Sequence, residues 1–120
     1  MNFLKEFEDV QSEAYYIAVD HGFWVGGIEP GPDVTTVLSK LALIHSEVSE
    51  VLEHVRSGAD PQEVWYRQGD GKPEGIGPEL ADVVIRTMDL AEALEVPLAF
   101  RIIEKQEFNK SRPHMHGKEA

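Results

Sequence analysis

Apolar residues recur along the chain at alternating spacings of three and four, which is the period of an amphipathic helix. In the first such segment the apolar positions are Phe3, Leu4, Phe7, Val10, Ala14, Ile17 and Ala18. The same period predicts four helices, over residues 2–20, 34–56, 78–96 and 97–110. No segment reads as a strand. The pattern therefore predicts an all-α fold.

Residues with known roles at helix ends support these boundaries. Asp33 can cap the second helix, Gly58 can end it, and Pro78 fits the first turn of the third. The segments left over are predicted as a loop over residues 21–32, a short helical turn over 60–65 and a glycine-rich loop over 69–77.

Four amphipathic helices with antiparallel neighbours predict a four-helix bundle. A chain of 120 residues has room for a single domain, spanning residues 1–120. Two long amphipathic helices in so small a chain also favour self-association, as a homodimer or as a dimer of dimers.

The charge balance limits the possible partners. A net charge of −11 disfavours a nucleic acid, because binding a polyanion requires clustered Lys and Arg. No apolar run approaches the ~18 residues of a membrane span, and the acidic N-terminus is unlike a signal peptide, so we expect a cytoplasmic protein without a membrane partner. Without cysteine, any metal must be bound by oxygen or imidazole.

Two pairs of acids share a spacing of three residues. Glu47 and Glu50 lie in the second predicted helix, and Glu79 and Asp82 begin the third. Each pair occupies one helical face beside the apolar stripe, whereas Glu53 falls on the face away from it. Close carboxylates repel by up to about 4 kcal/mol per pair at an effective dielectric near 20. A hard cation such as Mg²⁺ or Mn²⁺ would neutralise them, and such ions also accept phosphate oxygens.

The acid pairs, with the sequence around them, resemble the all-α nucleoside triphosphate pyrophosphohydrolases of the MazG-like kind. Relatives in that superfamily are MazG, the dimeric dUTPases and phosphoribosyl-ATP pyrophosphohydrolase. The resemblance covers roughly residues 33–118. It extends through residues 41–47 and 79–85 and the closing set Lys105, Asn109, Lys110, Arg112, Pro113, His116, Gly117 and Lys118.

This resemblance implies a metal-dependent enzyme that hydrolyses a nucleoside triphosphate to a monophosphate and pyrophosphate, in nucleotide-pool housecleaning or remodelling. It implies that Mg²⁺ or Mn²⁺ is bound by the four acids, which are the expected catalytic residues: Glu47, Glu50, Glu79 and Asp82. Such a cation could bridge phosphate oxygens and activate a water for in-line attack. Three alternatives stay open: a base-selective enzyme, for example for GTP or dGTP, a phosphoribosyl-ATP pyrophosphohydrolase, and a metal-stabilised binding module without turnover.

Further residues are candidates for binding the nucleotide. Five of the eleven basic residues lie between Arg101 and Lys118. The candidates for the phosphates are Lys105, Asn109, Arg112 and Lys118. The candidates for a nucleobase pocket are His21, Trp24 and Lys40, although packing of Trp24 back onto the helices is an equal alternative.

Overall fold

The computed structural model describes residues 2–24 and 32–114 and contains four helices in these ranges. The elements are α1 (Phe3–Asp20), α2 (Val34–Arg56), β1 (Trp65–Tyr66), β2 (Pro73–Glu74), α3 (Ile76–Ala93) and α4 (Leu98–Ser111). The predicted all-α class is confirmed, and the helix boundaries lie within three residues of those expected from the sequence.

The residues predicted to begin and end α2 do so in the structure. The side chain of Asp33 accepts a hydrogen bond from the backbone N–H of Thr36 at 2.7 Å. Gly58 follows the end of α2 with a φ of +82°, a conformation that glycine adopts without steric cost. These local interactions explain why the boundaries of α2 could be read from the sequence.

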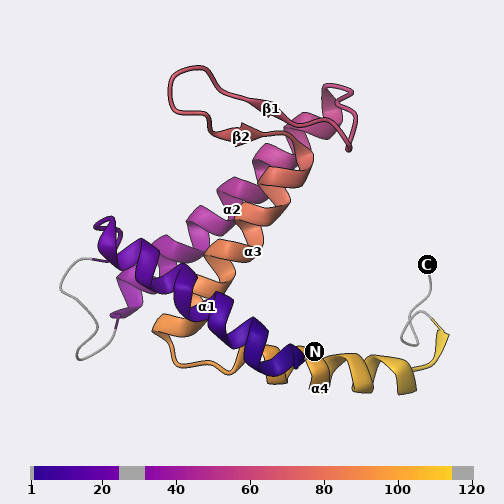
Figure 1. Cartoon of the computed structure of the whole chain (residues 1–120). Coiled ribbons are helices and arrows are strands. Elements are labelled where there is room, and N and C mark those ends of the chain that lie inside the picture. The colour runs from indigo at the N-terminus through magenta and orange to yellow at the C-terminus, as the bar shows by residue number, and fades with distance from the viewer. Residues whose placement is uncertain (1, 25–31, 115–120) are drawn as a thin grey trace.

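Helices α2 and α3 lie side by side in antiparallel orientation, and α1 crosses α3 (Figure 1). Helix α4 contacts α1 and extends away from the α2–α3 pair (Figure 1). A closed bundle of four helices is therefore not formed within the described part of the chain. The turn before α4, in which Glu95 adopts a φ of +57°, directs that helix away from the other three.

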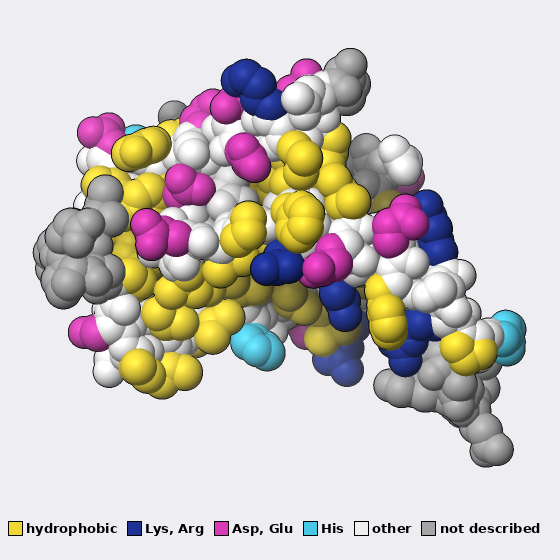
Figure 2. Space-filling model, turned by 90° about the horizontal axis from the view of Figure 1, so that it is seen from below, with side chains coloured by type: hydrophobic (Ala, Val, Ile, Leu, Met, Phe, Trp, Pro, Cys, Tyr) yellow, Lys and Arg dark blue, Asp and Glu magenta, His cyan; other side chains and the backbone are white. Residues whose placement is uncertain are grey.

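The core is small and includes a residue from the predicted loop. Tyr15, Trp24, Leu90 and Ala93 form a buried cluster. Many large apolar side chains remain exposed on the helices, and Figure 2 shows hydrophobic patches among acidic side chains on one face. None of the described helices combines the length and hydrophobicity that a membrane crossing requires.

A β-hairpin occupies the segment predicted to be a helical turn and a loop. Trp65 pairs with Glu74 and Tyr66 with Pro73, in antiparallel register. The prediction that the chain contains no strand was therefore wrong. The two strands were missed because a strand of two residues is too short to show a period in the sequence. Gly75 joins the hairpin to α3 with a φ of +130°, where a Cβ atom would lie 2.6 Å from a backbone oxygen. The hairpin is thereby held close to the start of α3.

Candidate functional site

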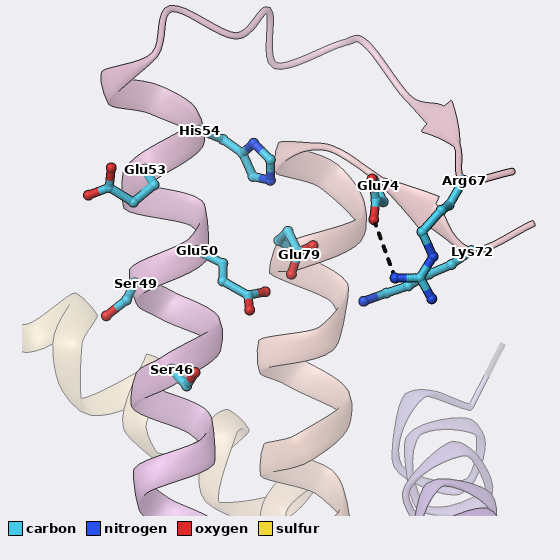
Figure 3. Close-up of a pocket in the computed structure, with 9 residues that line it drawn as sticks. All are labelled: Ser46, Ser49, Glu50, Glu53, His54, Arg67, Lys72, Glu74 and Glu79. Carbon is cyan, nitrogen blue, oxygen red and sulfur yellow. Dashed lines mark ion pairs between the residues drawn. The ribbon is translucent and has the colours of Figure 1, made fainter.

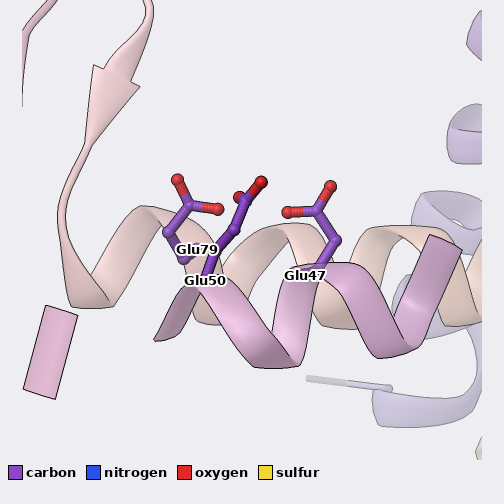
Figure 4. A group of neighbouring side chains, drawn as sticks. All are labelled: Glu47, Glu50 and Glu79. Atoms are coloured by element: carbon purple, nitrogen blue, oxygen red, sulfur yellow. The ribbon is translucent and has the colours of Figure 1, made fainter. Parts of the chain in front are cut away.

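Three carboxylates from two helices meet on one side of the α2–α3 pair. Glu47 and Glu50 are one helical turn apart on α2, and Glu79 lies in the first turn of α3. One carboxylate oxygen from each of the three lies within 4.8 Å of the others. Figure 4 shows the three side chains pointing to the same side. The antiparallel packing of two helices thus assembles acids that are about 30 residues apart in the chain.

Glu79 is the most buried member of this cluster, with 4% of its surface exposed. Burial, and then the nearby carboxyl groups of Glu50 and Glu47, raise the pKa of Glu79 to about 7. Its Oε2 atom is buried and has no hydrogen-bond partner among the described residues. An unsatisfied buried oxygen is costly, so this atom is suited to a ligand that the protein itself does not supply.

Glu47 is tied to α3 by an ion pair. The Arg86 Nε atom donates to Glu47 Oε1 at 2.8 Å, in a partly buried position. Asp82 lies near this pair but outside the cluster of three acids. Burial, followed by the charge of Glu47, raises the pKa of Asp82, whereas Lys72 and Arg86 oppose the shift. The fourth predicted acid therefore belongs to the margin of the cluster.

A cavity of about 520 Å³ opens between the acids and the hairpin. Glu50 and Glu79 line one side, and Arg67 and Lys72 of the hairpin line the other (Figure 3). Arg67 is already paired with Asp70. Lys72 makes no ion pair within 4 Å in the part of the chain described. The acid Glu74 also lies on the hairpin side (Figure 3), so the bases there face the acids of the helices but do not stand alone around a space that can admit a small ligand.

A second, more enclosed cavity of about 270 Å³ adjoins the same acids. Glu47, Asp82 and Lys72 line one part of it, and Phe23 and Lys40 line another. Because Lys72 lines both cavities, the two spaces meet near its side chain. The larger cavity is lined by charged and polar side chains, and the smaller one combines charged side chains with aromatic and aliphatic ones.

The three residues proposed for a base pocket have different surroundings. Lys40 lines the smaller cavity, and its Nζ atom lies 4.3 Å from the centroid of the Trp24 ring. Trp24 itself is a buried core residue whose indole N–H donates to Asp89 at 2.8 Å. Its ring is therefore not open for stacking on a base. His21 is exposed at the end of α1, beside the Ile17 carbonyl, and lines neither cavity.

The C-terminal candidates lie apart from the acids. Lys105, Asn109 and Arg112 are on or just after α4, and none lines either cavity in the described chain. Lys105 and Arg112 lie over the Phe108 ring, at 5.8 and 5.4 Å. Lys118 lies outside the described residues. The described residues of this segment therefore do not form a phosphate clamp around the site of their own chain.

Sequence reasoning missed three basic residues at the site. Arg86 is seven positions after Glu79, a spacing that returns to the same helical face, so this signal was present in the sequence. Arg67 and Lys72 gave no comparable signal, because only the hairpin places them opposite the acids.

The donors at the cluster fit a hard divalent cation. They are carboxylate oxygens from two helices, and one of them, on Glu79, is buried without a partner among the described residues.

Among known proteins, no family model, no curated sequence and no solved structure matches the chain. The functional assignment therefore depends on the site's own geometry and on the resemblance in the sequence.

Proposed function

We propose that this chain is a MazG-like, metal-dependent nucleoside triphosphate pyrophosphohydrolase that cleaves the α–β phosphoanhydride bond. The observation that carries the proposal is the cluster of Glu47, Glu50 and Glu79, with an unpartnered buried oxygen, facing Arg67 and Lys72 of the hairpin across a cavity. A phosphate chain needs both a cation and positive side chains, and this site offers ligands for the first and supplies the second.

In this proposal Glu47, Glu50 and Glu79 hold Mg²⁺ or Mn²⁺, with Asp82 beside them. When bound, the cation supplies charge neutralisation for the phosphate oxygens and activation of water. Arg86 holds Glu47 in place through its 2.8 Å hydrogen bond. A carboxylate that is fixed by a second residue keeps its ligand geometry without further ordering on binding.

In this proposal the hairpin binds the phosphates of the nucleotide, and the smaller cavity binds its base. Lys72 contacts the phosphates in this scheme, because it lines both cavities and has no ion-pair partner among the described residues. The cavity of about 270 Å³ takes the base, with Phe23 and Lys40 on its walls. A flat aromatic base suits such mixed walls, since every base offers a face for stacking and edges for hydrogen bonds.

Self-association and a cytoplasmic role in nucleotide-pool housecleaning or remodelling are part of the same proposal. The exposed apolar side chains favour a homodimer or homotetramer. The predicted phosphate residues of α4 point to the same conclusion, because they lie away from the acids of their own chain. In an oligomer they could serve the site of another copy.

The test is pyrophosphate release from the eight common ribo- and deoxyribonucleoside triphosphates, with Mg²⁺, with Mn²⁺ and with chelator. We expect metal-dependent release that falls at least about 100-fold in Glu50→Gln, because a neutral amide is a poorer ligand for a hard cation. Glu53→Gln is the matched control. Glu53 also lines the cavity, but its side chain points away from Glu50 and Glu79 in Figure 3 and pairs with Arg56 at 3.5 Å, so this variant should retain activity.

The outcomes separate the alternatives. Release from one nucleotide alone would indicate a base-selective enzyme, and release from phosphoribosyl-ATP alone would indicate that narrower activity. Metal-dependent nucleotide binding without pyrophosphate release from any substrate would contradict the enzyme and favour a binding module.

A further inference from the structure

A buried carboxylate that has no role in the proposed hydrolysis lines the smaller cavity. Asp89, on α3, is 9% exposed and is one of the residues around the cavity of about 270 Å³. Its Oδ1 atom accepts a hydrogen bond from the indole N–H of Trp24 at 2.8 Å. A carboxylate offers about four acceptor sites, so this bond leaves Asp89 able to accept further donors. A carboxylate in such a position is suited to a ligand that presents N–H groups.

An ammonium group that is held in place lines the same cavity. The Lys40 Nζ atom donates to the Phe23 carbonyl at 2.6 Å and lies 4.3 Å from the centroid of the Trp24 ring. The hydrogen bond uses one of its three N–H groups. Burial raises the pKa of Asp89, whereas the Trp24 hydrogen bond and the charge of Lys40 oppose the shift. Lys40 and Asp89 are thus close enough to interact, although they form no ion pair with each other in the described chain.

A cation and a carboxylate held apart in one pocket favour a flat ligand with an acceptor at one end of its edge and donors at the other. Guanine has this edge, because its O6 atom accepts while its N1–H and N2–H₂ groups donate side by side. Parallel N–H donors are the arrangement that a carboxylate binds best. Adenine and cytosine offer one amino group beside an accepting ring nitrogen, and uracil and thymine offer one N–H between two carbonyls. Guanine is therefore the common base that uses both Lys40 and Asp89 fully.

The position of Asp89 along α3 fits a nucleotide whose phosphates lie at the acids. Asp82 and Asp89 are seven residues apart, a spacing that returns to the same helical face, and both line the smaller cavity. With a rise of about 1.5 Å per residue, they are roughly 10 Å apart along the helix axis. This separation leaves room for the ribose between the base and the phosphates. Phe23 and Ile85 also line the cavity and offer apolar contacts to the faces of a base.

We propose that Asp89 and Lys40 select guanine as the base of the nucleotide. The Lys40 ammonium donates to guanine O6, and the Asp89 carboxylate accepts from N1–H and N2–H₂. Guanine selection rests on the proposed function, because it takes the smaller cavity as the base pocket. It adds the substrate class, GTP or dGTP, and it makes Asp89 a residue that determines specificity.

The variant that tests this assignment is Asp89→Asn. Its amide oxygen can still accept from Trp24, whereas its NH₂ group puts a donor where the carboxylate had an acceptor. Guanine then loses the acceptor for its 2-amino group, and xanthine, which has a carbonyl at that position, gains a donor. We expect wild type to prefer guanine to xanthine and hypoxanthine by about 30-fold, and Asp89→Asn to prefer xanthine to guanine. A purely structural role of Asp89 would not reverse the preference.

Two measurements are made with Mg²⁺ on the full chain. Isothermal titration calorimetry gives the dissociation constants of the α,β-methylene analogues of GTP, XTP, ITP, ATP, CTP and UTP, which resist cleavage at the α–β position. Pyrophosphate release from the natural triphosphates gives kcat/KM. Asp9→Asn is the matched control, because Asp9 is exposed and pairs with Lys5 at 3.1 Å, and its base preference should equal that of wild type. Circular dichroism confirms that each variant keeps its helices.

Tighter binding of the GTP analogue than of the ITP analogue, converted by Asp89→Asn into a preference for the XTP analogue, supports guanine selection. Equal affinity of wild type for the GTP and ITP analogues would overturn it without any variant, and so would an unchanged preference in Asp89→Asn. Selective binding of the GTP analogue without pyrophosphate release would contradict the enzyme but support the base assignment. Pyrophosphate release without a base preference would support the enzyme and overturn the assignment of guanine.

Discussion

The buried carboxyl group of Glu79 makes the stability of the metal-free protein depend on pH. Burial and the neighbouring acids raise the pKa of Glu79 from 4.5 to about 7. Between pH 4.5 and about 7 the Glu79 carboxyl group stays protonated in the folded chain but loses its proton in the unfolded chain. The protonated carboxyl group therefore stabilises the fold fully below pH 4.5, and this stabilisation is lost as the pH rises through about 7. At about 1.4 kcal/mol per pKa unit, the full shift corresponds to a loss of about 3 kcal/mol.

The substitution Glu79→Gln removes this titration while keeping the shape of the side chain. The free energy of unfolding of the variant, relative to wild type, should increase by about 2 kcal/mol between about pH 5.5 and pH 8.5. Urea unfolding in the presence of chelator measures this difference, and Glu53→Gln is the control that should show no such trend. Added Mg²⁺ should reduce the advantage of Glu79→Gln at high pH, because the cation stabilises the ionised wild-type cluster.

Parallel pH profiles for wild type and Glu79→Gln would refute this reasoning. They would mean that the Glu79 carboxyl titrates alike in the folded and unfolded chains, and that the cluster of acids is hydrated in solution.

Three further substitutions test other parts of the structure. Lys72→Gln should raise KM for a nucleoside triphosphate about tenfold with little change in kcat, because the variant loses a charged contact to phosphate. Steady-state kinetics measure both constants. Trp24→Phe should lower the free energy of unfolding by about 1–3 kcal/mol, because it leaves a buried carboxyl group without its donor. Gly75→Ala should destabilise the chain by about 1–3 kcal/mol, because of its φ of +130° and the close backbone oxygen. Urea unfolding measures the last two.

Controls for these substitutions come from the same structure. Arg67→Gln should affect KM less than Lys72→Gln, because Asp70 already pairs with the Arg67 guanidinium. Trp65→Phe should cost less than about 1 kcal/mol, since its hydrogen bond to Glu74 is exposed. A larger KM effect from Arg67→Gln would contradict the phosphate contact of Lys72. Equal losses of stability from the two tryptophan variants would contradict the structural role of the Trp24 hydrogen bond.

The four helices and most of their ends could be predicted from the sequence. The residues at the helix ends, such as Asp33, Gly58 and Pro78, act on backbone groups a few positions away. Such local interactions can be predicted from a short stretch of sequence. The spacing of Glu47 and Glu50 is local in the same sense, because one turn of helix places them on one face. The apolar runs of the sequence are short, and none of the described helices is long and apolar enough to cross a membrane.

The tertiary structure alone decided how these elements meet. The hairpin that carries Lys72, the departure of α4 from the other helices, and the burial of Trp24 against Tyr15 all depend on contacts between distant segments. The pairing of Arg86 with Glu47 joins residues 39 positions apart. The hydrophobic period and the capping residues predict only the structure formed by residues close together in the chain. Contacts between distant segments depend on the summed packing of side chains, and that sum, not any local pattern, places acids and bases around one cavity.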